Sequence, residues 1–249
     1  MRGPSAISYP HDFQVTLISA HRGGSSVEGR GAAERYASAI ALGVDYVELD
    51  VRRSLDGVMV VSHDDCTLSG RRIDQFAYDD LYDELGPEAM TLDQLLDIAA
   101  GRVGLHLDLK ETGYEAEVVN RVLERCPLDR LVITAEDAGV QAIKEALPQV
   151  RAGLSLGEDL QGISPWGKAR VRLSELFPRR RLLSCHADFV AVHWQLAQLS
   201  VLRYCERVGL PAWVWTVNDE PDIARFLADT RVTTLITDRP DIAVRLRSG

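Results

Sequence analysis

Short β-rich segments alternate with longer helix-like segments along almost the whole chain, and this alternation is the strongest constraint on the fold. The strand-like runs cover residues 15–20, 45–51, 58–62, 103–109, 130–134, 151–155, 188–192, 212–217 and 233–237. Amphipathic segments lie between most of them, at 31–42, 91–100, 114–125, 136–146, 195–208 and 219–228. Such alternation predicts a parallel sheet covered by helices, and the number of units favours an α/β protein with a closed (β/α)8 TIM barrel.

The strand-like runs exceed the eight places of a barrel by one. Segments 45–51 and 58–62 are separated by "RRSLDG" alone, and a parallel crossover needs about a dozen residues or more. The "LDG" sequence is typical of a hairpin turn. We therefore expect 58–62 to form an accessory hairpin strand that runs antiparallel to the second barrel strand, above the barrel mouth.

No repeat, low-complexity tract or change of composition divides the chain. With 249 residues and 46% hydrophobic composition, one barrel can bury a substantial core, so residues 1–249 are predicted to form a single domain. Segment 156–184 is the least patterned part, polar at first and then rich in arginine.

The formal net charge of −9 argues against nucleic acid as a partner, because the phosphate backbone would be repelled. The N-terminal "MRGPSAISYPHDF" lacks the apolar core of a signal peptide, and no segment approaches the ~18–20 apolar residues of a spanning helix. Four scattered cysteines fit reduced thiols. We expect a cytoplasmic protein without stable membrane insertion, and no basic amphipathic helix is evident.

Two carboxylates interrupt the apolar strand "DYVELDV". Residues i and i+2 share one face of a strand, so Glu48 and Asp50 are expected to project together into the barrel mouth. Two unpaired carboxylates would repel each other, and a divalent cation would relieve that repulsion. The alternative is a salt bridge at the strand end with Arg52 or Arg53.

The segment "GLHLDLK" strengthens the metal interpretation. His106, Asp108 and Lys110 alternate with leucines, and the last two lie at the carboxyl end of the strand, where barrel enzymes assemble their sites. The oxygen-rich set of Glu48, Asp50 and Asp108 suits Mg²⁺ or Ca²⁺. His106 lies deeper and is expected to be a buried histidine with a hydrogen-bond partner.

Histidines and cations are predicted at the same rim. His21 and Arg22 end the first strand in "SAHRGG", whose paired glycines allow the backbone to approach a ligand. His63 would reach this rim if the hairpin folds back. Such a set suits a phosphoryl group, because Arg22 and Lys110 offset its charge while the histidines exchange protons.

Aromatic residues mark a third strand, "AWVWTVND". Trp213 is expected in the core, whereas Trp215 is nearer the mouth and suits an apolar wall for an alcohol or a choline-like cation. His193 and Trp194 are secondary lining candidates. Asp238, in "LITDRP", is expected to have a turn or cap role.

The order "AHRGG … YVELDV … DGVMVVSHDD … LHLDLK … VWTVND … LITDRP" resembles the glycerophosphodiester phosphodiesterases, a family of phosphatidylinositol-phospholipase-C-like TIM barrels. The resemblance runs from about residue 18 to 240. It implies that His21 and His63 are a general acid–base pair and that Arg22 and Lys110 contact phosphate. It also implies one divalent cation, Mg²⁺ or Ca²⁺ with Mn²⁺ possible, on Glu48, Asp50 and Asp108.

The implied partner is a small-molecule glycerophosphodiester, hydrolysed to an alcohol and glycerol 3-phosphate by water or through attack by a substrate hydroxyl. The chain departs from the family in reading "VEGRGAAE", with Glu28 and Arg30, where a Pro-Glu-Asn-Thr-like segment is usual. "HLDLK" is closer to the related sphingomyelinase D/phospholipase D branch. Alternatives are therefore an enzyme acting on lysophospholipid headgroups and a barrel that binds a phosphodiester or a protein without catalysis.

Overall fold

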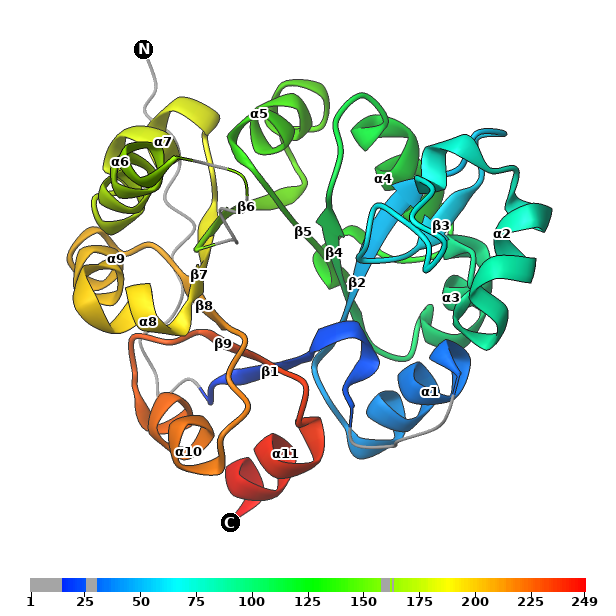
Figure 1. The fold of residues 1–249 in the computed structure, drawn as a ribbon. Helices are drawn as coiled ribbons and strands as arrows, with labels where there is room; N and C mark the ends of the chain where they lie inside the picture. Colours follow the sequence, from blue (N-terminus) through cyan, green and yellow to red (C-terminus); the bar gives the residue numbers. More distant parts are fainter. Residues whose placement is uncertain (1–14, 26–30, 158–161, 163) are drawn as a thin grey trace.

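The computed structural model describes residues 15–25, 31–157, 162 and 164–249. Eight parallel strands close into a barrel with helices around the outside (Figure 1). They run in the order β1-β9-β8-β7-β6-β5-β4-β2, and pairing of β1 with β2 closes the ring. The strands are β1 (Leu17–Ala20), β2 (Tyr46–Arg53), β4 (Gly104–Leu109), β5 (Leu131–Ala135), β6 (Arg151–Leu156), β7 (Phe189–His193), β8 (Ala212–Trp215) and β9 (Thr234–Thr237). The predicted (β/α)8 barrel is confirmed.

The ninth strand, β3 (Met59–Val61), lies outside the ring and pairs antiparallel with β2. Val51 faces Val61 in this hairpin, and the Ser62 N–H donates to the Asp50 carbonyl at 3.1 Å. The predicted accessory hairpin is confirmed. It brings the segment after β3 to the carboxyl end of β2.

The six predicted amphipathic segments all form helices. Helix α3, for example, begins with a capping box in which Thr91 and Gln94 satisfy each other's backbone N–H groups, and it buries Leu92, Leu95 and Leu96. These helices are α1 (Ala32–Leu42), α3 (Leu92–Ala99), α4 (Glu115–Leu123), α5 (Asp137–Ala146), the continuous run α8 (Trp194–Leu196), η5 (Ala197–Val201) and α9 (Leu202–Val208), and α10 (Glu220–Ala228).

Four further helices were not predicted: α2 (Tyr78–Leu85), α6 (Pro165–Leu176), α7 (Arg179–Cys185) and α11 (Pro240–Ser248). The poorly patterned segment 156–184 contains two of them. Helix α6 escaped detection because its apolar residues do not form a buried face, and Glu175 is the one residue that it buries.

Apolar side chains of the described residues form three clusters, of which the smallest packs Val60 of β3 against Ile73, Phe76 and Leu81. The other two form the barrel. The larger lies between the strands and the surrounding helices. The smaller fills the lower part of the barrel lumen, where Trp213 packs against Tyr46 and Phe189 with ring centroids 5.2 and 4.9 Å away. The predicted core position of Trp213 is confirmed, and this cluster closes the lumen beneath the barrel mouth.

Among the helices of the described residues, none combines the length and the apolar character that crossing a bilayer requires.

Candidate active site

The three predicted metal-binding carboxylates lie side by side at the barrel mouth. Strands β2 and β4 pair so that Asp50 stands opposite Asp108, while Glu48 lies two residues deeper on the same face of β2. One oxygen from each of the three lies within 4.8 Å of the others. The alternative salt bridges are wrong, because Arg52 pairs with Glu111 and Arg53 lies near Glu117.

Burial and charge give these carboxylates different proton affinities. Burial, reinforced by the Asp50 carboxylate, raises the pKa of Glu48 well above its usual range, although nearby His21 opposes the rise. Burial also opposes ionisation of Asp108, but the Lys110 ammonium, 2.5 Å away, lowers the pKa of that carboxyl. The site therefore concentrates negative charge that further cationic groups can stabilise.

The turn after β1, η1 (His21–Gly23), aims the main chain at the carboxylates. Arg22 has φ 51° and ψ 35°, a left-handed conformation that is costly for a residue with a Cβ. In this conformation the Arg22 N–H donates to Glu48 Oε2 at 2.8 Å. Gly23 and Gly24 also have positive φ, and a Cβ on Gly24 would lie 2.7 Å from Pro240. These glycines permit the turn and its close packing, and the approach of the backbone to a ligand stays a prediction.

The side chains of Arg22 and Lys110 converge on Asp50. Arg22 Nε lies 3.1 Å from one carboxylate oxygen, and Lys110 Nζ lies 3.1 Å from the other. Among the described residues, Arg22 Nε and Asp50 Oδ1 are nevertheless buried without a well-directed hydrogen bond. The contacts with Asp50 are therefore charge contacts.

His21 is held by Asp238 at the point where the barrel closes. Its Nδ1 lies 2.6 Å from Asp238 Oδ1, and Asn218 Nδ2 donates to the other oxygen of that carboxylate at 2.7 Å. Burial lowers the proton affinity of His21, but Glu48 and the Asp238 hydrogen bond together raise its pKa. The expected turn or cap role of Asp238 is wrong. The pairing of Ala20 with Thr237 brings the two next residues together.

His63 follows the hairpin to the same cavity. Its main-chain carbonyl accepts hydrogen bonds from Arg52 Nε at 3.1 Å and Arg52 Nη2 at 2.7 Å, while Arg52 Nη1 is anchored to Glu111 at 2.7 Å. Its own Nδ1 lies 2.7 Å from Asp64 Oδ1. Arg52 is thus a positioning residue that the sequence suggested only as a salt-bridge partner.

His106 forms part of the polar floor of the site. Its Nδ1 lies 3.3 Å from Ser19 Oγ and its Nε2 lies 3.0 Å from Thr134 Oγ1, and Thr134 in turn donates to Asp108 at 2.8 Å. Burial lowers the pKa of His106 to about 4, so the ring stays neutral. The predicted buried, hydrogen-bonded histidine is confirmed.

A cavity of about 460 Å³ unites these groups. Its charged side carries His21 and His63 with Arg22, Glu48, Asp108 and Lys110. Its other side is formed by Ala191, Trp215, Thr216 and Ile236. The Trp215 ring packs edge-on against His193 at 5.4 Å, and its buried Nε1 has no hydrogen-bond partner among the described residues. His193 and Trp194 contact each other but are absent from the described lining, so His193 supports Trp215 from behind the wall.

Comparisons with known proteins agree with this geometry. Residues 21–137 match the model of the glycerophosphoryl diester phosphodiesterase family. The chain is also 23% identical to a glycerophosphodiester phosphodiesterase of Caldanaerobacter subterraneus, over 93% of this chain and 97% of that protein. The chain is thus similar to the glycerophosphodiester phosphodiesterases, the family that its motifs resemble. Enzymes of this family are phosphoric diester hydrolases.

Further relatives cover nearly the whole barrel. A Mycobacterium tuberculosis protein named "Probable glycerophosphodiester phosphodiesterase 2" is 29% identical over 91% of this chain and 88% of its own length. An Oleispira antarctica phosphodiesterase, solved in complex with the product sn-glycerol-3-phosphate, superposes with a TM-score of 0.72 at 22% identity, covering 94% of this chain and 98% of that one. The glycerophosphodiester phosphodiesterase fold therefore extends well beyond the matched residues 21–137.

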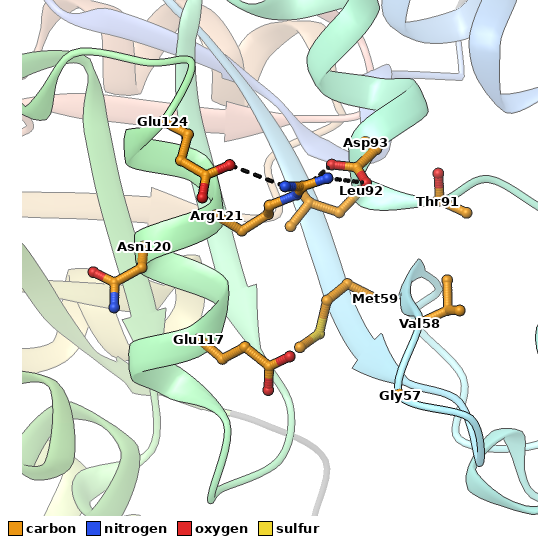
Figure 2. A pocket seen from close by; sticks show the side chains of 10 residues that line it. All are labelled: Gly57, Val58, Met59, Thr91, Leu92, Asp93, Glu117, Asn120, Arg121 and Glu124. Carbon is orange, nitrogen blue, oxygen red and sulfur yellow. Dashed lines mark hydrogen bonds and ion pairs between the residues drawn. The ribbon is translucent and has the colours of Figure 1, made fainter.

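A second cavity, of about 520 Å³, lies outside the barrel between β3, α3 and α4 (Figure 2). It is slightly larger, but the basic residue in its described lining, Arg121, is already paired with Asp93 and Glu124 at 2.7 and 2.9 Å. No histidine is among its described lining residues. Of the two cavities, the one in the lumen carries the groups that suit phosphoryl chemistry. Glu28 and Arg30, which mark the divergent "VEGRGAAE" segment, lie outside the described residues.

Proposed function

We propose that this protein hydrolyses small glycerophosphodiesters to an alcohol and glycerol 3-phosphate with the help of one divalent cation. The observation that carries the proposal is a single cavity in which an Asp238-bound His21 lies beside three clustered carboxylates and two basic side chains. Such a set can neutralise a phosphodiester and move protons at its oxygens.

The carboxylates fit a hard divalent cation. Glu48, Asp50 and Asp108 offer only oxygen, as Mg²⁺, Ca²⁺ and Mn²⁺ prefer, and their oxygens are close enough to share one ion. Burial, together with repulsion from Asp50, raises the pKa of Glu48, and a bound cation would favour the ionised carboxylate. When bound, the ion would polarise the phosphoryl group and offset its charge.

The two histidines divide the proton transfers. Asp238 engages Nδ1 of His21 and Asp64 engages Nδ1 of His63, which leaves Nε2 of each ring for the substrate. One histidine removes the proton from the nucleophile, which is either water or a hydroxyl of the substrate. The other protonates the alcohol oxygen that leaves. Arg22 and Lys110 bind the phosphate oxygens, while Trp215 packs against the alcohol.

A metal-by-substrate panel tests the proposal. Protein stripped of metal should not hydrolyse glycerophosphocholine, and adding Mg²⁺, Mn²⁺ or Ca²⁺ should restore the release of choline and glycerol 3-phosphate, because the clustered carboxylates repel an unshielded phosphodiester. Following the phosphorus by NMR shows whether a cyclic phosphate forms first, which would identify a substrate hydroxyl as the nucleophile. Failure to hydrolyse any glycerophosphodiester with any of these ions would contradict the proposal.

The panel also separates the alternatives. Faster release of choline from lysophosphatidylcholine than from glycerophosphocholine would assign the enzyme to lysophospholipid headgroups. Binding of a cation or phosphodiester by titration calorimetry without any hydrolysis would identify a non-catalytic barrel. The Asp50→Asn variant tests the carboxylate cluster itself, since it removes one carboxylate charge while keeping nearly the same side-chain shape.

A further inference from the structure

Helix α6 buries a charged side chain and exposes large apolar ones, which is the reverse of the usual pattern in a surface helix. The residue that it buries is Glu175, whereas Trp166 and Leu173 are 88% and 58% exposed, and Phe177, which follows the helix, is 68% exposed. Helix α3, by contrast, buries its apolar residues against the barrel. A helix covering a barrel normally turns its apolar stripe inward, so the outward stripe on α6 requires another explanation.

The exposed apolar residues form one stripe. Trp166, Leu173 and Phe177 are spaced by seven and four residues, which places them on one side of the helix. Leu183 of α7 and Leu199 of η5 are also exposed, at 61% and 58%. The Ser200 hydroxyl, next to Leu199, donates to the Leu176 carbonyl at 2.6 Å and ties η5 to α6. Helices α6, α7 and α9 lie together on the outside of the barrel (Figure 1).

Positive charge surrounds this stripe. Residues 165–186 contain six lysine and arginine residues and one acidic residue, in a chain whose formal net charge is −9. The acidic one, Glu175, is turned inward, where it accepts the Gly157 N–H at 2.9 Å and pairs with Arg172 at 2.7 Å. The exposed basic side chains are Lys168, Arg170, Arg179 and Arg180. A basic, aromatic surface thus lies on an otherwise acidic protein.

We propose that this surface, the α6 face (Trp166, Lys168, Arg170, Leu173, Phe177, Arg179 and Arg180), binds reversibly to bilayers that contain anionic phospholipids. Tryptophan and other apolar side chains enter the interfacial region of a bilayer, while lysine and arginine are attracted to anionic headgroups. Two copies meeting face to face through this surface would bring like charges together, so charge complementarity favours the lipid.

The position of α6 links the surface to the cavity. A helix that follows a barrel strand starts at the end where the strand leaves the sheet, which is the mouth. Trp166, in the first turn of α6, therefore lies toward the rim that carries the histidines and carboxylates. Docking through the α6 face holds the cavity close to the lipid surface. The inference does not depend on the reaction proposed above.

The sequence did not suggest this surface because apolar and basic residues are interspersed along α6. A search for a helix with separate apolar and charged faces passes over such a segment, and only the burial of Glu175 reveals which side faces the barrel.

Vesicle flotation with the full chain tests the proposal. Phosphatidylcholine vesicles containing phosphatidylglycerol should carry the protein upward at low salt, and pure phosphatidylcholine vesicles should carry much less. Raising the salt should weaken binding, because screening reduces the attraction of basic residues to the surface. Trp166 emission should shift to shorter wavelength on binding, and the shift should vanish in Trp166→Phe while flotation persists.

Two variants of the α6 face address its two components. Arg170→Glu combined with Arg179→Glu should weaken binding to anionic vesicles by about tenfold or more, since each basic residue near such a surface contributes a several-fold attraction. Trp166→Gln combined with Leu173→Gln and Phe177→Gln should abolish flotation. The matched control is Tyr82→Ser with Arg102→Glu, a substitution of exposed residues elsewhere on the protein.

The control should float like the unaltered protein, and all variants should hydrolyse soluble substrate and melt as it does. The proposal would be overturned if the unaltered protein did not bind anionic vesicles, or if both α6-face variants bound them as well as the unaltered protein does. A dimer seen by sedimentation without lipid, and lost in these variants, would also overturn the proposal. The α6 face would then be a contact between two copies of the protein.

Discussion

The carboxyl ends of β1, β2 and β4 differ sharply from those of β7 and β8, although all of them border the same cavity. On the first side, charged groups are fixed by directed contacts, as His21 is by Asp238 and the His63 carbonyl is by Arg52. On the second side, Trp215 is placed by ring packing against His193. Directed contacts fix single atoms, whereas packed rings fix only a surface. The charged side is therefore suited to catalysis and the aromatic side to substrate selection.

Removing either histidine is the most severe test of that division. His21→Ala and His63→Ala should each lower kcat by about 10²- to 10⁴-fold, the usual contribution of general acid–base catalysis. Hydrolysis of glycerophosphocholine, with thermal melting to verify folding, provides the measurement. Replacing His186, an exposed histidine, by alanine is the control. Near-normal turnover in either active-site variant would remove the charged side from catalysis.

Loss of Arg52 should have the next largest effect. Arg52→Leu frees the His63 main chain, and misplacement of a catalytic group by about 1 Å can cost roughly 10²-fold in rate. The loss should fall on kcat with KM little changed, and Arg52→Lys should recover part of it. The neighbouring Arg53→Leu is the matched control, because the contact of Arg53 with the exposed Glu117 carboxylate is long, at 3.8 Å. Equal losses in both variants would mean a general structural effect.

The contrast between these contacts also explains which parts of the site the sequence could predict. Glu48, Asp50 and Asp108 were predictable because alternation along one strand fixes the face of each side chain, and the parallel register of β2 and β4 completes the set. The barrel and its hairpin followed from strand spacing in the same way. These are local patterns, which can be read from a single sequence.

Contacts made by barrel closure were not predictable in that way. His21 and Asp238 are 217 residues apart and meet only because β1 pairs with β9. Arg52 reaches His63 because the hairpin turns back on itself. Helix α6 was missed because its apolar residues face outward. In each case the deciding information lies in three-dimensional neighbours.

On the aromatic side, Trp215→Leu should change substrate preference more than catalytic capacity. A tryptophan face attracts a quaternary ammonium group, so kcat/KM for glycerophosphocholine should fall by about tenfold. Glycerophosphoglycerol, whose alcohol is uncharged, should be affected much less. Trp194→Leu is the control because Trp194 is not part of the described cavity lining. Equal losses with both substrates would show that Trp215 does not select the alcohol.

The smallest expected effect concerns His193, which supports Trp215 from behind. Burial, assisted by the nearby Arg172 guanidinium, lowers the pKa of His193, although Glu175 opposes this. The unfolded chain therefore binds this proton first, and the folded state loses stability as the pH falls through the ordinary histidine value of about 6.5. His193→Gln lacks that titration, so its free energy of unfolding should fall less between pH 7 and pH 5 than that of the unaltered protein. Urea unfolding at several pH values measures the difference, with His186→Gln as the control. Parallel pH profiles for all three proteins would mean that protonation of His193 does not oppose its packing behind the aromatic wall.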